Sequence, residues 1–81
     1  MEKIMQVIGQ VEEKSLSVMV DEEDKWIFLD VEDIGAYDYA GVCKMHEAFR
    51  TMADIYEEDA YPMEYYIDGW KISVAYASWE L

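Results

Sequence analysis

An Asp-Gly pair, Asp68-Gly69, separates two runs in which apolar and polar residues alternate. Alternation with a period of two is typical of a strand with one buried face. Asp-Gly is the strongest short signal for a hairpin, because a type I′ turn needs two positive φ angles. We therefore expect strands at residues 63–67 and 70–79. Such a hairpin must bury its apolar face against another element.

Residues 16–31 predict a second hairpin, because apolar residues alternate on either side of four consecutive acids. If Val20 lies opposite Lys25, the two apolar sets fall on the same face of the sheet. The same register sets Asp21 across from Asp24. Like charges in this position destabilise a hairpin by a few tenths of a kcal/mol or more.

Residues 39–58 predict a helix that ends before Tyr61-Pro62, with Asp38 as its N-cap. Its apolar positions follow a period of 3.6 and form one stripe. The stripe consists of Val42, Met45, Phe49, Ala53 and Tyr56.

Residues 2–11 admit two interpretations. The residues that would share one face of a helix are Ile4, Val7, Ile8 and Val11. However, Met5, Val7 and Val11 alternate about Gly9, and the β-branched residues of this stretch favour a strand. We favour the strand, which gives the order β-β-β-α-β-β; the helical alternative gives αββαββ. In both, residues 1–81 form a single α+β domain, an antiparallel sheet of four to five strands with one long helix packed on one face.

One long helix leaves the second face of such a sheet uncovered. That face would carry Met19, Trp26, Phe28, Tyr66 and Trp79. A monomer rarely exposes a contiguous apolar patch of more than a few hundred Å². We therefore expect this face to be covered either by an N-terminal helix, or by a partner or second copy in a homodimer.

The net charge is the outlying property of the composition. Nineteen Asp and Glu residues against six Lys and Arg residues give a formal charge of −13, whereas solubility needs a magnitude of roughly 2–8 in a small domain. This field opposes direct binding to nucleic acid or to an anionic membrane. It favours a basic protein as the partner.

No pattern in the chain predicts catalysis, a cofactor or a metal. Cys43 and His46 are one helical turn apart, but a metal site needs three or four ligands, and a thiol–imidazole pair lacks an orienting third group. We interpret His46 as a histidine at the edge of the core. The acids lack the glycine and spacing of a calcium loop, and no glycine-rich phosphate loop follows a strand. We expect a protein that is not an enzyme.

The expected location is the cytoplasm of a host cell. Cys43 is the only cysteine, which fits a reducing compartment. The first residues do not read as a secretory signal, and no apolar run is long enough to span a bilayer.

The acids of the chain gather in three clusters, DEED (21–24), DVED (30–33) and EED (57–59). In these clusters, and in length, strong negative charge and expected fold, the chain resembles the small acidic DNA-mimic inhibitors of phages and mobile elements. These include anti-restriction proteins, the uracil-DNA glycosylase inhibitor and several anti-CRISPR proteins. The resemblance implies no catalysis and no cofactor, and it implies inhibition by occupying a basic nucleic-acid-binding surface of a defence or DNA-processing protein. The alternative is an acidic adaptor that binds through the aromatic sheet face.

The expected contact residues follow from these clusters. Those for the basic partner are Asp21, Glu22, Glu23, Asp24, Asp30, Glu32, Asp33, Glu57, Glu58 and Asp59. Those for a dimer or adaptor face are Trp26, Phe28, Tyr66 and Trp79.

Overall fold

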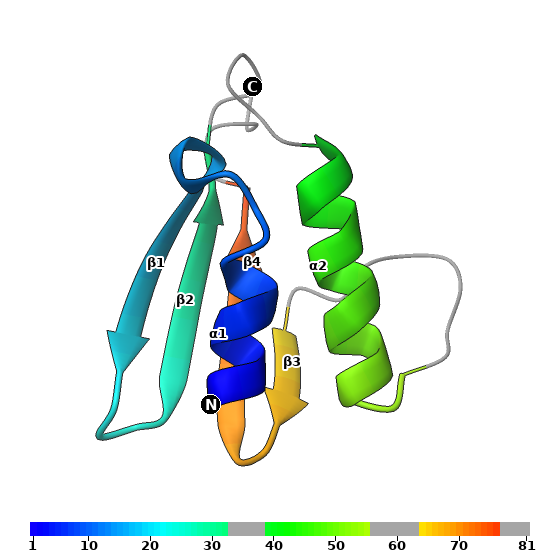
Figure 1. The fold of residues 1–81 in the computed structure, drawn as a ribbon. Helices are drawn as coiled ribbons and strands as arrows, with labels where there is room; N and C mark the ends of the chain where they lie inside the picture. Colours follow the sequence, from blue (N-terminus) through cyan, green and yellow to red (C-terminus); the bar gives the residue numbers. More distant parts are fainter. Residues whose placement is uncertain (33–38, 56–63, 77–81) are drawn as a thin grey trace.

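Two helices and four strands make up the described part of the computed structural model, which comprises residues 1–32, 39–55 and 64–76 (Figure 1). In chain order the elements are α1 (Glu2–Ile8), the 3-10 turn η1 (Glu13–Ser15), β1 (Leu16–Asp21), β2 (Trp26–Val31), α2 (Tyr39–Met52), β3 (Glu64–Ile67) and β4 (Trp70–Ala75). This order matches the helical alternative for the N-terminal segment. The favoured strand at residues 2–11 is wrong.

The N-terminal segment is helical because a helix buries its apolar residues together. Ile4 and Ile8 lie one turn apart on α1 and are 0% and 5% exposed. Burying an isoleucine side chain is favourable by roughly 1.5–3 kcal/mol, whereas the low helix propensity of a β-branched residue costs less than ~1 kcal/mol. Tertiary packing therefore outweighs the local preference for a strand.

The sheet is mixed, which corrects the expected antiparallel sheet. Its strand order is β1-β2-β4-β3, with antiparallel pairs inside each hairpin and a parallel pair of β2 with β4 at the centre. The parallel pair sets Ile27 beside Ile72 and Leu29 beside Val74. These four side chains are buried, and they lie on the two central strands of the sheet.

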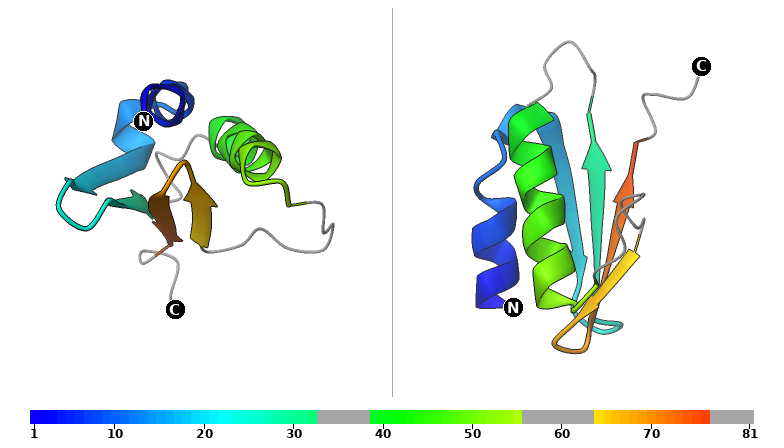
Figure 2. Two further views of the ribbon diagram at one scale, coloured as in Figure 1. Left: turned by 90° about the horizontal axis from the view of Figure 1, so that it is seen from below. Right: turned by 90° about the vertical axis from the view of Figure 1, so that its right-hand side faces the viewer.

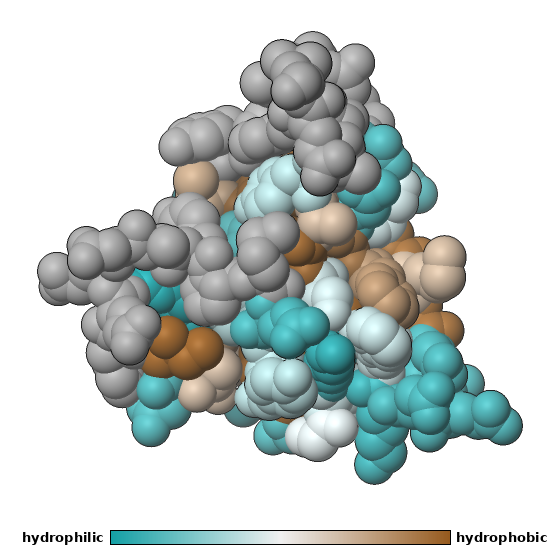
Figure 3. Space-filling view, turned by 180° about the vertical axis from the view of Figure 1, so that it is seen from behind, coloured by the Kyte–Doolittle hydropathy of each residue, from teal (hydrophilic) through white to brown (hydrophobic). Residues whose placement is uncertain are grey.

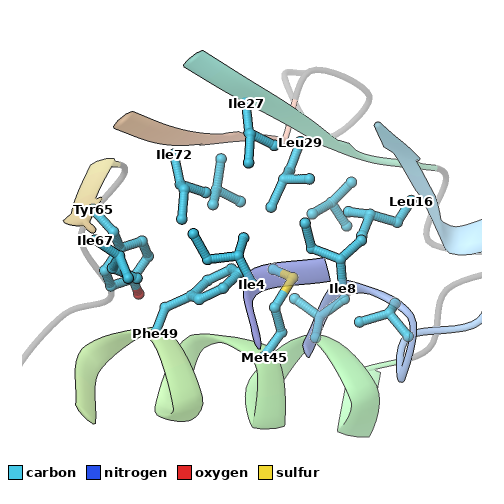
Figure 4. Close-up of a cluster of buried hydrophobic side chains, with 14 residues drawn as sticks. Ile4, Ile8, Leu16, Ile27, Leu29, Met45, Phe49, Tyr65, Ile67 and Ile72 are labelled. Carbon is cyan, nitrogen blue, oxygen red and sulfur yellow. The ribbon is translucent and has the colours of Figure 1, made fainter. Parts of the chain in front are cut away.

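Both helices lie on the same face of the sheet (Figure 2). Of the two alternatives for the second face, cover by an N-terminal helix is therefore wrong, since α1 packs beside α2. The core between the helices and the sheet combines α1, α2 and all four strands (Figure 4). Its α2 members Val42, Met45 and Phe49 belong to the predicted stripe.

α2 has 14 residues and ends at Met52, so the predicted helix at residues 39–58 is too long. The chain leaves the helix at Asp54, which has a φ of 61°. The Asp54 N–H donates to the Thr51 carbonyl at 3.2 Å and the Ile55 N–H to the Arg50 carbonyl at 2.9 Å. These two bonds form the Schellman motif that closes a helix C-terminus. The predicted stripe position Ala53 therefore lies outside the helix, and Tyr56 and the expected N-cap Asp38 lie outside the described residues.

The hairpin of β3 and β4 confirms the predicted turn. Asp68 and Gly69 have φ angles of 51° and 81°, the two positive values that a type I′ turn needs. The strands are Glu64–Ile67 and Trp70–Ala75, and the remainder of the predicted 70–79 strand from residue 77 onward lies outside the described residues.

Candidate binding surfaces

The hairpin of β1 and β2 carries the acidic tip, residues 21–24. The loop between its two strands is longer than expected. Asp21 pairs with Trp26, and Val20 pairs with Ile27 rather than with Lys25. The expected pairing of Asp21 with Asp24 is therefore wrong. The shift is two residues, so it keeps every side chain on its predicted face.

Backbone hydrogen bonds stabilise this tip. Oδ1 of Asp21 accepts from the Glu23 N–H at 3.1 Å and from the Asp24 N–H at 3.3 Å, as in an Asx turn. Lys25 closes the loop with a φ of 51°, and its carbonyl accepts the Lys71 N–H of β4 at 2.9 Å. These contacts explain how four consecutive acids remain in one short loop.

The structure separates the roles of the tip residues. Asp21 is half-buried and holds the turn, whereas Glu22, Glu23 and Asp24 are exposed. The three exposed carboxylates are therefore available to a partner, and Asp21 has a structural role.

Asp30 on β2 and Glu32 just after it lie on the sheet face that the helices leave uncovered. Both are half-buried. The Ser17 hydroxyl donates to a carboxylate oxygen of Glu32. Oδ1 of Asp30 is buried and has no hydrogen-bond partner within the described residues. The other expected contact residues, Asp33, Glu57, Glu58, Asp59 and Trp79, lie outside the described residues.

The uncovered face, called here the outer face, has an ordered aromatic centre. The Trp26 ring lies 4.2 Å from the Phe28 ring between centroids, and its Nε1–H donates to the Ser73 hydroxyl at 2.8 Å. The Lys71 ammonium lies 4.3 Å from the Trp26 ring centroid and 3.2 Å from a carboxylate oxygen of Glu64. Trp26 is thus fixed by contacts within the chain.

Exposed apolar residues of the outer face lie within this centre and around it. Met19 is 69% exposed, Tyr66 65% and Phe28 40%. Figure 3 shows this face, with apolar side chains beside the hydrophilic hairpin tip. Of the expected dimer or adaptor residues, the structure brings Trp26 and Phe28 together, with Tyr66 two strands away.

A groove beside β1 was not predicted. It has a volume of about 480 Å³ and is lined by Ile8, Gly9, Gln10, Val11, Glu12, Glu13, Leu16 and Val18. It arises because α1 and the turn after it lie near the edge strand. The sequence does place apolar Ile8 and Val11 next to the acids Glu12 and Glu13. However, only the helical alternative for residues 2–11 would have put these side chains beside β1.

His46, which was expected at the edge of the core, is fully buried and forms a polar cluster that the sequence did not reveal. Its imidazole is 0% exposed, with Nδ1 2.6 Å from the Tyr65 hydroxyl and Nε2 2.5 Å from the Tyr76 hydroxyl. Burial, and secondarily the positive charge of Arg50, lowers the pKa of His46 from 6.5 to about 4. A neutral imidazole donates from one nitrogen and accepts at the other, so both hydroxyls can be satisfied. The cluster acts as a polar centre inside the core.

Within residues 1–32, 39–55 and 64–76, no group of three or more His, Cys, Asp and Glu side chains could hold a metal ion. Neither helix in that part of the chain combines the length and apolar character needed to cross a membrane.

No family model, no curated protein and no solved structure matches the chain.

Proposed function

We propose that this protein is a non-enzymatic acidic inhibitor that binds the basic nucleic-acid-binding surface of a defence or DNA-processing protein. The observation that supports the proposal most is the acidic tip: Glu22, Glu23 and Asp24 are exposed at the end of a hairpin whose turn is held by Asp21. A fixed set of carboxylates loses less conformational freedom on binding than a flexible acidic tail.

The charge of the molecule is comparable with that of DNA. The longest dimension of the structure is 33 Å, and a duplex of this length carries roughly 19 charges, at one per ~1.7 Å. The chain carries nineteen acids and a net charge of −13. A basic surface that binds DNA would therefore attract this protein strongly, and the association would be fast and salt-sensitive.

The test is displacement of DNA from purified proteins. A panel of restriction and CRISPR nucleases is loaded with fluorescently labelled duplex, and the chain is titrated at low and high salt. We expect it to displace duplex from at least one nuclease, with an affinity that falls as salt increases.

A matched pair of variants identifies the acids responsible. Glu22→Ser/Glu23→Ser/Asp24→Ser removes the exposed tip charges and retains Asp21, while Glu2→Ser/Glu47→Ser/Asp54→Asn removes the same number of exposed charges elsewhere. We expect a large loss of inhibition in the first variant only. An equal loss in both would show that net charge, and not the tip, is responsible, and failure to displace duplex at low salt from any member would count against the proposal.

A second function, an adaptor that binds through the outer face, is favoured by the exposure of Met19 and Tyr66. In that case Met19→Ser/Tyr66→Ser should abolish partner binding, and the tip variant should bind normally.

A homodimer through the same face remains a prediction, for which light scattering at low and high salt is the measurement.

A further inference from the structure

The edge of β1 has backbone groups available for pairing with another strand. β1 is an edge strand in the order β1-β2-β4-β3. The Glu32 N–H donates to the Ser15 carbonyl at 2.9 Å, which extends the β1–β2 ladder by one residue pair. Bonded and non-bonded residue pairs alternate along an antiparallel ladder. Val18 and Val20 therefore direct their N–H and C=O groups away from β2.

These outward groups begin at Val18, because the Leu16 N–H already donates to the Glu13 carbonyl in η1. Within the described part of the chain, no strand pairs with the β1 edge and no hydrogen bond engages the outward groups of Val18 and Val20. An uncovered row of this kind is a template for an added strand.

The side chains beside this edge are also incompletely covered. Val18 and Val20 lie on the helix-bearing face of the sheet, opposite Leu29 and Ile27, yet they are 41% and 39% exposed. The 480 Å³ groove continues from Val18 to Ile8 and Val11 of the N-terminal segment. An added strand would place alternate side chains about 5 Å from the two valines, where they would cover them and enter the groove.

The charge around the edge defines the occupant. Residues 12–25 contain six acids and two lysines, a net charge of −4. The acids flank β1, with Glu12 and Glu13 in the groove before it, Asp21 at its last position and residues 22–24 after it. A second copy pairing antiparallel through β1 would bring the acidic tip of one chain beside Glu12 and Glu13 of the other. Repulsion therefore opposes self-pairing, and a basic strand is attracted.

We propose that the β1 edge and its groove bind an extended segment of a partner, in which apolar residues alternate with Lys or Arg, as an additional strand of the sheet. The inference rests on the proposed function, because it supplies the binding mode of the basic partner. The backbone of the segment pairs with Val18 and Val20, and its apolar residues cover the two valines and fill the groove. Its basic residues alternate onto the outer face, where Asp21 and Glu32 lie beside β1.

The probe is a short synthetic peptide in which valine and lysine alternate, titrated into the ¹⁵N-labelled full chain. We expect slower hydrogen exchange at the Val18 and Val20 amides, with salt-sensitive binding. The same peptide with glutamate in place of lysine should bind at least about tenfold more weakly, since two unfavourable charge pairs exceed ~1.4 kcal/mol.

A matched pair of variants isolates the backbone contribution. Val18→Pro/Val20→Pro removes two outward N–H donors and no β1–β2 hydrogen bond, a placement that edge strands tolerate. Val18→Ile/Val20→Ile retains the donors and the apolar, β-branched character. We expect the proline variant to bind the lysine peptide about tenfold or more weakly, from two lost hydrogen bonds, and the isoleucine variant to bind within about threefold of the original chain. If the proline variant does not fold, hydrogen exchange at the Val18 and Val20 amides of the unaltered chain, with and without the lysine peptide, tests the inference.

The outcomes distinguish this inference from the proposed function. If the lysine peptide shifts only the tip residues, leaves the Val18 and Val20 amides unprotected and binds the proline variant equally, the strand-edge inference is overturned and the inhibitor proposal stands. Equal binding of the glutamate peptide, or protection of both amides by self-association without peptide, also overturns it. If DNA displacement fails in the nuclease panel but the lysine peptide protects both amides, the edge inference stands and the inhibitor proposal fails.

Discussion

Nδ1 of His46 lies 2.6 Å from the hydroxyl oxygen of Tyr65, and both residues are buried, at 0% and 1% exposed. The pair joins α2 to the edge strand β3, so a polar contact fixes the position of the helix on the sheet. Water cannot readily replace a hydroxyl removed from such a site.

We expect Tyr65→Phe to lower the free energy of unfolding by about 1–2 kcal/mol, the usual effect of removing a partner from a buried polar group. Tyr76→Phe is the matched variant, since Tyr76 contacts the other imidazole nitrogen at 2.5 Å but is only half-buried. Its effect should be smaller because solvent can reach the site. Urea denaturation of both variants measures the difference, and a larger effect of Tyr76→Phe would contradict this account.

Stability should decrease as the pH falls from about 6.5 to about 4. In this range His46 binds a proton in the unfolded chain, with a pKa near 6.5, but remains neutral in the folded chain, where burial and Arg50 lower its pKa to about 4. The unfolded state then binds more protons, so stability rises with pH, by up to ~3 kcal/mol across the interval. Below pH 4 both states are protonated and the contribution is constant.

The control for this pH dependence is His46→Gln, which cannot titrate. Urea midpoints of the two chains between pH 4 and 7 should show the extra slope in the original chain only, on top of the background from the carboxylates. Parallel curves would show that His46 does not titrate in this way.

Replacing Asp54 by glycine should stabilise the protein. Asp54 has a φ of 61° at the C-terminus of α2, where glycine is the favoured residue and a carboxylate interacts unfavourably with the helix dipole. We expect Asp54→Gly to raise the free energy of unfolding by about 0.5–1 kcal/mol, measured as an increase in Tm. Asp54→Asn removes the charge but not the side chain, so an equal gain in both would assign the effect to charge and not to backbone conformation.

The tip acids should differ in their effect on stability. Asp21→Ala removes the acceptor for the Glu23 and Asp24 N–H groups and should cost about 0.5–1.5 kcal/mol. Glu22→Ala removes an exposed charge from a repulsive cluster and should change stability by less than ~0.5 kcal/mol. Asp21→Asn keeps an oxygen acceptor, so it should recover most of the loss; if it does not, the charge of Asp21 has a role that the turn geometry does not explain.

Local chemistry made part of the fold predictable. The turn at Asp68-Gly69 was predicted because its two positive φ angles depend on these two residues alone. The buried stripe of Val42, Met45 and Phe49 was predicted because its period is set by the helix itself. The end of α2 was missed, since no glycine marks the left-handed position that Asp54 adopts.

Features that depend on contacts between residues distant in sequence were harder to predict from the sequence. A shift of two residues in the register of β1 and β2 leaves every side chain on the same face of the sheet. The alternation of apolar residues therefore could not distinguish Val20 opposite Lys25 from Val20 opposite Ile27. The choice of helix for residues 2–11 depended on packing against α2 and the sheet. Of the candidate contact residues, the acidic tip was found from composition, whereas the groove and the His46 cluster needed the fold.

The parallel pairing of β2 with β4 also constrains how the chain folds. Each hairpin can form from neighbouring residues, but Ile27 meets Ile72 across more than half of the chain. Closing that long loop costs entropy before any contact compensates for it. The two hairpins should therefore be able to form early, and their association through the central pair should limit the folding rate.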